Sequence, residues 1–404
     1  MMKPTRRLLQ AGFTLVELMI SMVIGLLIML VLVTLLIDVN RSNSEMSKAN
    51  RVIENGRFAM QLLQADISHA GYLGGYVPQF DDLITTGFPP DYPTAAPDPC
   101  LAYTTPWTAA HITNLIGIAV QGYEIASPVP SPTLSVCASK VVSPKASTDV
   151  LVVRHVESCL PGVGDCAAFA AGDAYFQVAR CGTTTPSPAY TLAAYPADVT
   201  TVNTVFPLKQ RAVAVAGVTP ACTDVSVGFE EKRKFISNLY YIRDYAVTAG
   251  DGIPTLMRSQ FGMSGAVLEH KTAEALIEGI EGFRVEFGVD NISDSGAAVD
   301  HAAAINWADA TNKVSPTNRG DGTPDGAYVR CTTATPCTVA QLANATAVKI
   351  YVLVRSENKT PGYTDSKTYN LGSTTLGPFS DGYKRHLFSQ TIRMTNVSTR
   401  RETP

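Results

Sequence analysis

The 404-residue sequence carries none of the compact motifs that mark common catalytic sites. It has no Gly-x₄-Gly-Lys-Ser/Thr string for phosphate binding and no His-Glu-x-x-His string for zinc. Residues 262–266 lack the Gly-x-Ser-x-Gly spacing of a nucleophile elbow. Ser356 and Lys359 fit Ser-x-x-Lys, but they follow a predicted strand without the companion motifs, so we interpret them as a turn. The six histidines stand singly, and we expect no enzyme.

Charge is nearly absent from the start of the chain. Before Glu17 the only charged residues are three cations, Lys3, Arg6 and Arg7, and after it none follows until Asp38. Residues 13–37 therefore form an apolar run with one acid, roughly 37 Å long as a helix, enough to cross a hydrocarbon core of about 30 Å. A carboxylate at membrane depth costs about 2.5–3.5 kcal/mol or more, so the acid indicates a function.

Two ordinary membrane segments compete with this interpretation. A secretory signal peptide has an apolar core of about 7–15 residues and a small-x-small site after it. The run here is longer, and residues 36–40 offer no such site. A plain signal anchor leaves the string Gly12-Phe13-Thr14-Leu15-Val16-Glu17 unexplained.

That string resembles the processing site of type IV prepilins and type II secretion pseudopilins. The resemblance implies that a prepilin peptidase cuts between Gly12 and Phe13 on the cytoplasmic side and then methylates the new amine of Phe13. It also implies that Glu17 neutralises the N-terminal amine of an adjacent subunit in a helix bundle. The physics agrees, because a buried acid is tolerated when a cation pairs with it. Gly12 suits a cleavage position because it has no side chain to obstruct a protease.

Proline is absent between Pro4 and Pro78, which permits one helix from Phe13 to about Ala70, ended by Gly71. Apolar residues recur every seven positions in its second half, in two lines: Met46, Ile53, Met60 and Ile67, and Ala49, Gly56, Leu63 and Ala70. We expect this stripe to pack on the downstream domain. Gly56 costs a helix about 1 kcal/mol relative to Ala, which indicates close backbone packing. Asp66 has no obvious partner nearby in the sequence.

The rest of the chain predicts a sheet and a large insert. Residues 76–148 are rich in Pro, Thr, Ser and Ala and predict ordered loops with little regular structure. Apolar and alternating runs predict strands at 150–156, 236–245, 283–289, 348–354 and 387–394, and a short helix at 273–280. An antiparallel sheet packed on the long helix gives an α+β fold, with a disulfide-bearing, loop-rich insert at about 76–235.

All eight cysteines lie between Cys100 and Cys337. An even count in a translocated domain indicates disulfides formed in an oxidising compartment. Sequence proximity favours two local pairs, Cys159 with Cys166 and Cys331 with Cys337. The pairing of the other four cysteines stays open: Cys100, Cys137, Cys181 and Cys222. The x₆ and x₅ spacings, without a nearby histidine, argue against zinc.

One metal candidate lies in the glycine-rich stretch 318–326, where Asn318, Asp321 and Asp325 offer the oxygen ligands that calcium prefers. The full calcium-loop pattern is missing, so a turn between strands is the favoured interpretation and no cofactor is expected. The densest basic cluster, at 232–234, follows two glutamates. With a net charge of −3 we expect no nucleic-acid partner.

Later segments resemble PilW-type minor pilins. The marks are Glu-Asn-Gly-Arg-Phe-Ala at 54–59, Asp-Ile-x-x-Ala-Gly-Tyr at 66–72, and landmarks within 276–290, 348–356 and 383–396. The resemblance implies a type IV pilin-like fold. It also implies a minor pilin that joins other minor pilins to prime type IV pilus assembly and stays at or near the pilus tip.

The expected organisation has four parts: a cleaved basic leader at 1–12, a transmembrane helical half at 13–37, an amphipathic half at 38–71 and a periplasmic globular domain at 72–404. The basic leader predicts a cytoplasmic N-terminus in the inner membrane. The resemblance implies contacts with other minor pilins and the major pilin through the N-terminal helix, processing by prepilin peptidase, and a tip adhesin as a further partner.

Three alternatives remain open. The first is a minor pseudopilin of type II secretion, which shares fold and processing. The second is a membrane-anchored periplasmic binding protein or enzyme. The third, an adhesive or DNA-binding tip role located in residues 76–235, is compatible with the minor pilin interpretation.

Overall fold

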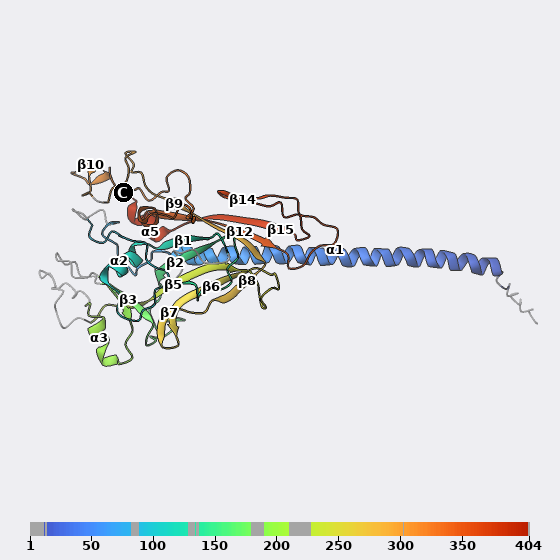
Figure 1. Cartoon of the computed structure of the whole chain (residues 1–404), viewed down its shortest axis with the longest axis horizontal. Coiled ribbons are helices and arrows are strands. Elements are labelled where there is room, and N and C mark those ends of the chain that lie inside the picture. Colours follow the sequence, from blue (N-terminus) through green and yellow to red (C-terminus); the bar gives the residue numbers. More distant parts are fainter. Residues whose placement is uncertain are drawn as a thin grey trace, which may run out of the picture. The chain divides into compact units, whose positions relative to one another are not determined.

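The computed structural model describes residues 12, 14–81, 89–127, 134, 137–178, 190–209, 228–301 and 303–402. Its first element is the helix α1, Leu15–His69 (Figure 1). The chain divides into two compact units, Met1–Arg51 and Val52–Pro404, so α1 contributes to both.

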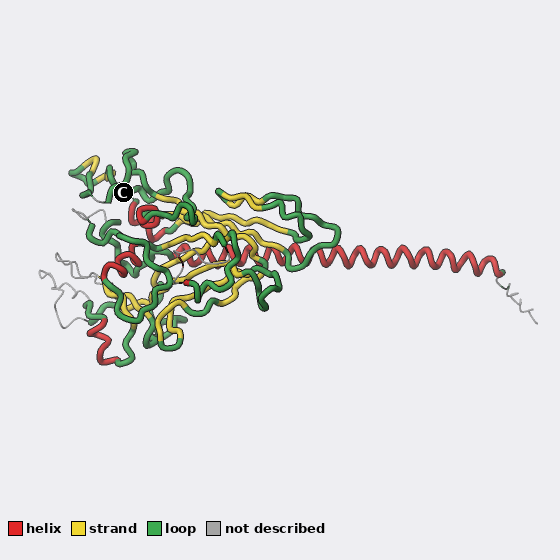
Figure 2. The backbone as a smooth tube through the Cα atoms, in the orientation of Figure 1, coloured by secondary structure: helices red, strands yellow, loops and turns green. Residues whose placement is uncertain are grey.

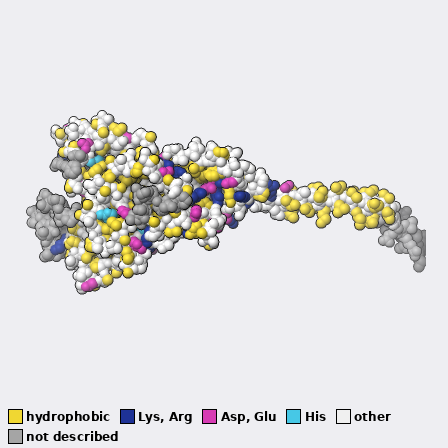
Figure 3. Space-filling view, viewed as in Figure 1, with side chains coloured by type: hydrophobic (Ala, Val, Ile, Leu, Met, Phe, Trp, Pro, Cys, Tyr) yellow, Lys and Arg dark blue, Asp and Glu magenta, His cyan; other side chains and the backbone are white. Residues whose placement is uncertain are grey.

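The first unit contains the apolar part of α1. Its side chains from Leu15 to Val39 are largely exposed, and Figure 3 shows apolar side chains along this stretch on the face in view. Among the described residues, α1 is the one helix long and apolar enough to cross a membrane. The described part of the expected span, 14–37, therefore has the required length and composition.

The second unit combines short helices with many strands (Figure 2). In chain order these are α2 (Ala109–Gly117), β1 (Val120–Ile125), β2 (Thr148–Val156), β3 (Ala174–Val178), β4 (Tyr190–Ala194), η2 (Val199–Thr201), α3 (Val202–Val205), β5 (Lys232–Arg243), β6 (Thr255–Ser264), β7 (Val267–His270), β8 (Glu274–Glu278), β9 (Ile280–Val289), β10 (Trp307–Asp309), β11 (Val314–Pro316), α4 (Val339–Ala343), β12 (Ala345–Arg355), β13 (Tyr369–Leu371), β14 (Thr374–Leu376), β15 (Arg385–Arg393) and α5 (Thr395–Arg401).

Two antiparallel sheets contain most of the described strands, and β10–β11 and β13–β14 form two further two-stranded sheets. The larger has the order β1-β2-β5-β3-β4, and β6 adds to β5 and also pairs with β7 and β8. The smaller has the order β15-β12-β9, with Val348 of β12 opposite Ile392 on one side and Phe287 on the other. All five predicted strands are present, and the α+β class is confirmed.

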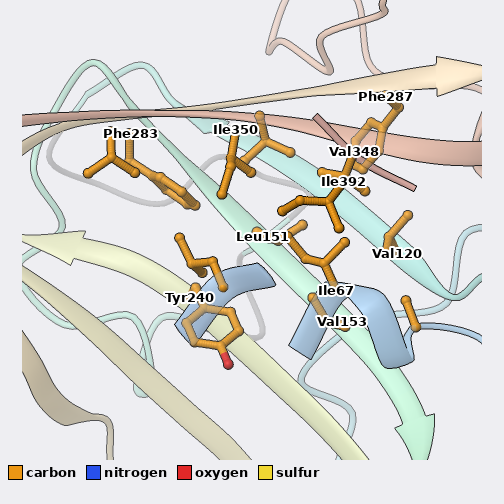
Figure 4. Packing of buried hydrophobic residues seen from close by; sticks show 14 of the residues in the cluster. Ile67, Val120, Leu151, Val153, Tyr240, Phe283, Phe287, Val348, Ile350 and Ile392 are labelled. Atoms are coloured by element: carbon orange, nitrogen blue, oxygen red, sulfur yellow. The ribbon is translucent and has the colours of Figure 1, made fainter. Parts of the chain in front are cut away.

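The core joins the end of α1 to both sheets. Leu63 and Ile67 of α1 are fully buried, in one cluster with side chains of β2, β5, β9 and β12. Figure 4 shows Ile67 near Leu151 and Val153 of the larger sheet, with Val348 and Ile392 of the smaller sheet nearby. The second half of the long helix is therefore a core element of the second unit.

The buried stripe of α1 differs in part from the expected one. Met60, Ile67, Gly56, Leu63 and Ala70 are buried as expected. Ile53 is 38% exposed and Met46 is exposed, whereas Val52 and Ala59 are buried instead. A strict seven-residue repeat drifts about 20° per heptad around a straight helix. The residues of the expected stripe therefore turn away from the core toward the N-terminal side, at Ile53 and Met46.

Two element predictions were wrong. Residues 274–278 form β8 instead of a helix, because they pair with Thr255–Arg258 of β6, and Gly279 follows at φ +81°. The stretch 76–148 is not merely loops, because it contains α2 and β1. The prolines of this stretch lie outside both elements, and β1 pairs with β2 along its whole length. The insert therefore supplies strands to the larger sheet.

Candidate functional site

The described N-terminal residues form a helix cap around Glu17. α1 begins at Leu15, and Thr14 precedes it as the N-cap residue. The Thr14 hydroxyl accepts from the Glu17 amide (3.3 Å), while the Thr14 amide and hydroxyl both donate to Glu17 Oε2 (2.9 Å each). This reciprocal capping box satisfies amides that a helix otherwise leaves unpaired.

The cap places one carboxylate at the first turn of the apolar helix. Glu17 lies at the positive end of the helix dipole, where an anion is stabilised. Its carboxylate remains exposed within the chain, so it is accessible to a cation of another molecule. Gly12 is exposed and has no neighbouring atoms where a side chain would lie, whereas Phe13 lies outside the described residues. The predicted cleavage, methylation and pairing roles stay predictions.

A polar cluster joins α1 to the larger sheet near the helix end. The Asp66 carboxylate of α1 accepts from Asn238 Nδ2 (3.0 Å) and Tyr240 Oη (2.8 Å) of β5, and pairs with His155 Nε2 of β2 (2.9 Å). We call these four residues the Asp66 cluster. They attach one helical position to two strands and give Asp66 the partners that its sequence neighbourhood does not show.

The electrostatics of the Asp66 cluster favour a charged pair. Burial alone would lower the pKa of His155, but the hydrogen bond and charge of Asp66 outweigh it and the pKa is raised. Glu157 acts in the same direction, and the His69 ring lies 5.7 Å from the His155 ring. Burial and the Asp66 charge raise the pKa of Tyr240, so its hydroxyl stays a donor.

Gly56 allows the smaller sheet to approach α1. A Cβ at this position would overlap the ring of Phe388, which belongs to β15. The expected close packing at Gly56 is therefore found within the chain. On the other side, Asn55 Nδ2 of the same helical turn donates to the backbone oxygen of Glu278 in β8 (3.0 Å). Adjacent residues of one turn thus contact two different sheets.

The last helix, α5, fixes the segment that follows α1. Arg401 Nη2 pairs with Asp81 (2.7 Å), and its guanidinium also lies 3.6 Å from Asp290. Arg400 pairs with Asp81 (3.2 Å) and donates to the backbone oxygen of Gly71 (3.3 Å). These side chains are largely buried, so the C-terminal helix is bound to the point where α1 ends.

The cysteines that the structure describes are all paired. Cys159 is bonded to Cys166 and Cys331 to Cys337, which are the two pairs favoured by the sequence. Cys100 is bonded to Cys137, a pairing that the sequence left open. Cys181 and Cys222, whose pairing the sequence also left open, lie outside the described residues.

The three calcium candidates each take part in hydrogen bonds of the turn. Asp325 accepts from two backbone amides (2.7 and 2.8 Å), and Asp321 accepts from an amide and a hydroxyl two residues on. The Asn318 side chain also bonds to backbone groups. Burial raises the pKa of neighbouring Asp290 to about 6, against the opposite effect of Arg401. These contacts fix the turn, and calcium binding there stays the less favoured of the two interpretations.

Within the described ranges, a single group of three side chains has metal-ligating atoms close together: Glu157, Cys159 and Cys166. The two cysteines are bonded to each other, so neither offers the thiolate that a metal requires.

Two parts of this arrangement were missed by sequence reasoning. The Thr14 cap had a signal, because Thr-x-x-Glu before an apolar run is a capping box signature. The partners of Asp66 had none, because they lie 89 to 174 positions away along the chain.

Two family models match this chain, one over the N-terminal processing motif and one over the C-terminal segments that resemble PilW-type pilins. The family model described as type IV pilus-assembly protein W matches residues 239–396, and the prokaryotic N-terminal methylation motif matches residues 7–33. No curated protein matches the chain. A solved type IV-like pilin from Thermus thermophilus aligns at 10% identity and a TM-score of 0.29, covering 86% of this chain and 97% of that one.

Proposed function

We propose that the chain is a PilW-like minor pilin, that it joins other minor pilins to prime type IV pilus assembly and that it stays at or near the pilus tip. The observation that carries this proposal is the position of the PilW match. Residues 239–396 run from within β5 to the start of α5 and include β9, β12 and β15. These are elements that bury the second half of α1, so the family-defining part is the part that holds the helix.

Before incorporation the chain is anchored in the inner membrane by the apolar half of α1, with its N-terminus cytoplasmic and the second unit periplasmic. The basic leader supports this orientation by the excess of cations on the cytoplasmic side. The three described disulfides support an oxidising compartment for the second unit.

Assembly proceeds by helix packing, and the protein has a structural role without turnover. Prepilin peptidase frees and methylates the Phe13 amine, and Glu17 pairs with the amine of a neighbouring minor or major pilin. The Thr14 cap supports this step because it holds the carboxylate at the helix start, next to the position where such an amine arrives. A tip adhesin is a further partner in this proposal.

The experiment compares surface pili, twitching motility and type II secretion in a deletion strain. The proposal expects pili and twitching to be lost and secretion to be kept, with all restored by the full chain. Intact pili together with failed secretion would instead identify a minor pseudopilin. A Glu17→Gln chain, which keeps the cap geometry but not the charge, is expected to restore pili poorly.

A further inference from the structure

The strand β15 has one open side. It pairs with β12 over nine residues without a bulge, and in the described part of the chain no backbone group pairs with its opposite side. The other outer strand of this sheet, β9, is interrupted by two register shifts and bridged by Val329. In the larger sheet, the outer strands β1, β4, β7 and β8 are four to six residues long.

The ladder shows which backbone groups face outward. The Met394 amide donates to Thr346 (2.9 Å) at one end, and the Ser356 amide donates to Lys384 (2.8 Å) at the other. Hydrogen-bonded pairs alternate along an antiparallel ladder, so the even-numbered residues of β15 bond to β12. The N–H and C=O groups of Leu387, Ser389 and Thr391 therefore point away from the sheet.

This edge lacks the usual protection. Residues 387–392 contain no proline and no charged side chain, and the pairing with β12 contains no bulge. Natural sheets normally shield long edge strands with such features, because unpaired backbone groups recruit other strands. A six-residue stretch of edge without these features, within a nine-residue strand that has Arg385 and Arg393 at its ends, indicates a place for an incoming strand.

The residues beside the edge of β15 indicate which kinds of side chain the incoming strand has. Phe388 is only partly buried where it covers Gly56, and Ile53, one turn earlier on α1, is 38% exposed. A strand added to β15 places every second side chain toward α1, over these two residues. Apolar side chains fit those positions, and polar ones fit the alternate positions beside the exposed Ser389 and Thr391.

The incoming strand is not β15 of a second copy of this chain. Phe388 packs on Gly56, and eight residues later Asn396 donates to the backbone of Ser68 (3.2 Å), so β15 and α1 run in the same direction (Figure 1). Two-fold antiparallel pairing of β15 with itself would make the two α1 helices antiparallel. Parallel packing of residues 56–68 of α1 between neighbouring subunits, as the proposed function has it, excludes that arrangement.

We propose that the open edge of β15 accepts an extended strand from a different subunit of the pilus tip, with apolar residues at alternate positions. The identity of the partner rests on the proposed function, because the strand is taken to come from another subunit of the pilus. It adds a sheet-to-strand contact in the second unit to the helix packing through α1.

The first test removes one outward N–H. Ser389→Pro deletes it and leaves the bonds to β12, since proline is tolerated where the N–H faces away from the sheet; Ser389→Ala keeps the N–H and serves as the control. We expect Ser389→Pro to lose surface pili and Ser389→Ala to keep them, at equal thermal midpoints. Normal pili in both strains, where the deletion strain has none, would overturn the strand proposal and leave the proposed function standing.

The second test does not depend on how proline is tolerated. Amide hydrogen exchange is measured residue by residue on the full-length wild-type chain in detergent, purified after expression alone or with the host's other minor pilins and tip adhesin. We expect slower exchange at Leu387, Ser389 and Thr391 only with the partners present. Equal rates would overturn the proposal, and protection in the chain expressed alone would identify a second copy instead. If the deletion strain keeps its pili, the proposed function fails. The exchange rates at Leu387, Ser389 and Thr391 still decide whether a strand binds to β15.

Discussion

At the scale of single residues, Asp66 carries the densest set of polar contacts between α1 and the sheets. One carboxylate pairs with His155 and accepts from Asn238 and Tyr240. Such a network is favourable only while every member has its partner, because an unpaired polar group in a low-dielectric site is costly. The attachment of the helix therefore depends on the charge states of Asp66 and His155.

The raised pKa of His155 predicts a pH dependence of stability. His155 binds its proton more tightly when folded than when unfolded, where its pKa is about 6.5. Its contribution is complete below that pH and is lost as the pH rises through the raised folded pKa. We expect the free energy of unfolding to fall over this interval, and to fall less in Asp66→Asn, where the charge partner is absent. Denaturant unfolding of both chains in detergent between pH 5.5 and 9 checks this; identical pH slopes would contradict it.

Single residues also show what the sequence could not give. The capping box at Thr14 and Glu17 is local and readable, because both partners lie within one turn. The partners of Asp66 come from strands whose placement depends on the whole fold. The pairing of Cys100 with Cys137 was likewise hidden, because 37 positions separate the two.

At the scale of elements, α1 shows why a costly residue is placed in mid-helix. Exposed in a plain helix, Gly56→Ala would stabilise by about 1 kcal/mol. Here the added methyl overlaps the Phe388 ring, and overpacking costs about 1–3 kcal/mol. We therefore expect Gly56→Ala to lower the free energy of unfolding, and Phe388→Leu to reduce this loss in the double variant. A stabilised Gly56→Ala chain would show that β15 does not pack on the helix.

The C-terminal helix α5 gives a second prediction at this scale. Arg401→Met removes the closest partner of buried Asp81 but leaves Arg400 at 3.2 Å, so the expected cost is near the lower end of the about 3–5 kcal/mol for breaking a buried pair. Arg393→Met is the matched control, because its pair with Glu402 is nearly half exposed and is worth about 0–1 kcal/mol. Chemical unfolding of the two variants compares them; equal losses would remove the role assigned to Arg401.

Elements differ in how well the sequence predicts them. The strict alternation of Phe283, Val285, Phe287 and Val289 identified β9, and Gly71 identified the end of α1. β8 was mistaken for a helix because its five residues carry no clear period and its conformation is set by pairing with β6. β1 was missed because it lies among proline-rich loops and is specified by β2.

At the scale of the whole molecule, the fold class and the two-part helix follow from the sequence, because hydrophobic run length and periodicity determine them. The division into two sheets that share α1 does not, since Leu63 and Ile67 indicate only that something covers them. The same limit applies to the open edge of β15, whose meaning depends on which strands lie beside it.

The loop of Asn318, Asp321 and Asp325 gives a prediction about metals. Its side-chain oxygens already accept hydrogen bonds that fix the turn, so we expect the thermal midpoint of the full chain to be the same in EDTA and in calcium. Magnesium serves as the ionic control. A midpoint raised by calcium alone, and not in Asp321→Asn, would establish a calcium site instead.

The most direct test of the central claim is the N-terminal mass of the chain extracted from membranes, with and without the host prepilin peptidase. A minor pilin requires a start at N-methylated Phe13 in the first strain and an uncleaved start in the second. A start at Met1 or Met2 in both strains would contradict the account and favour a membrane-anchored periplasmic protein of another kind.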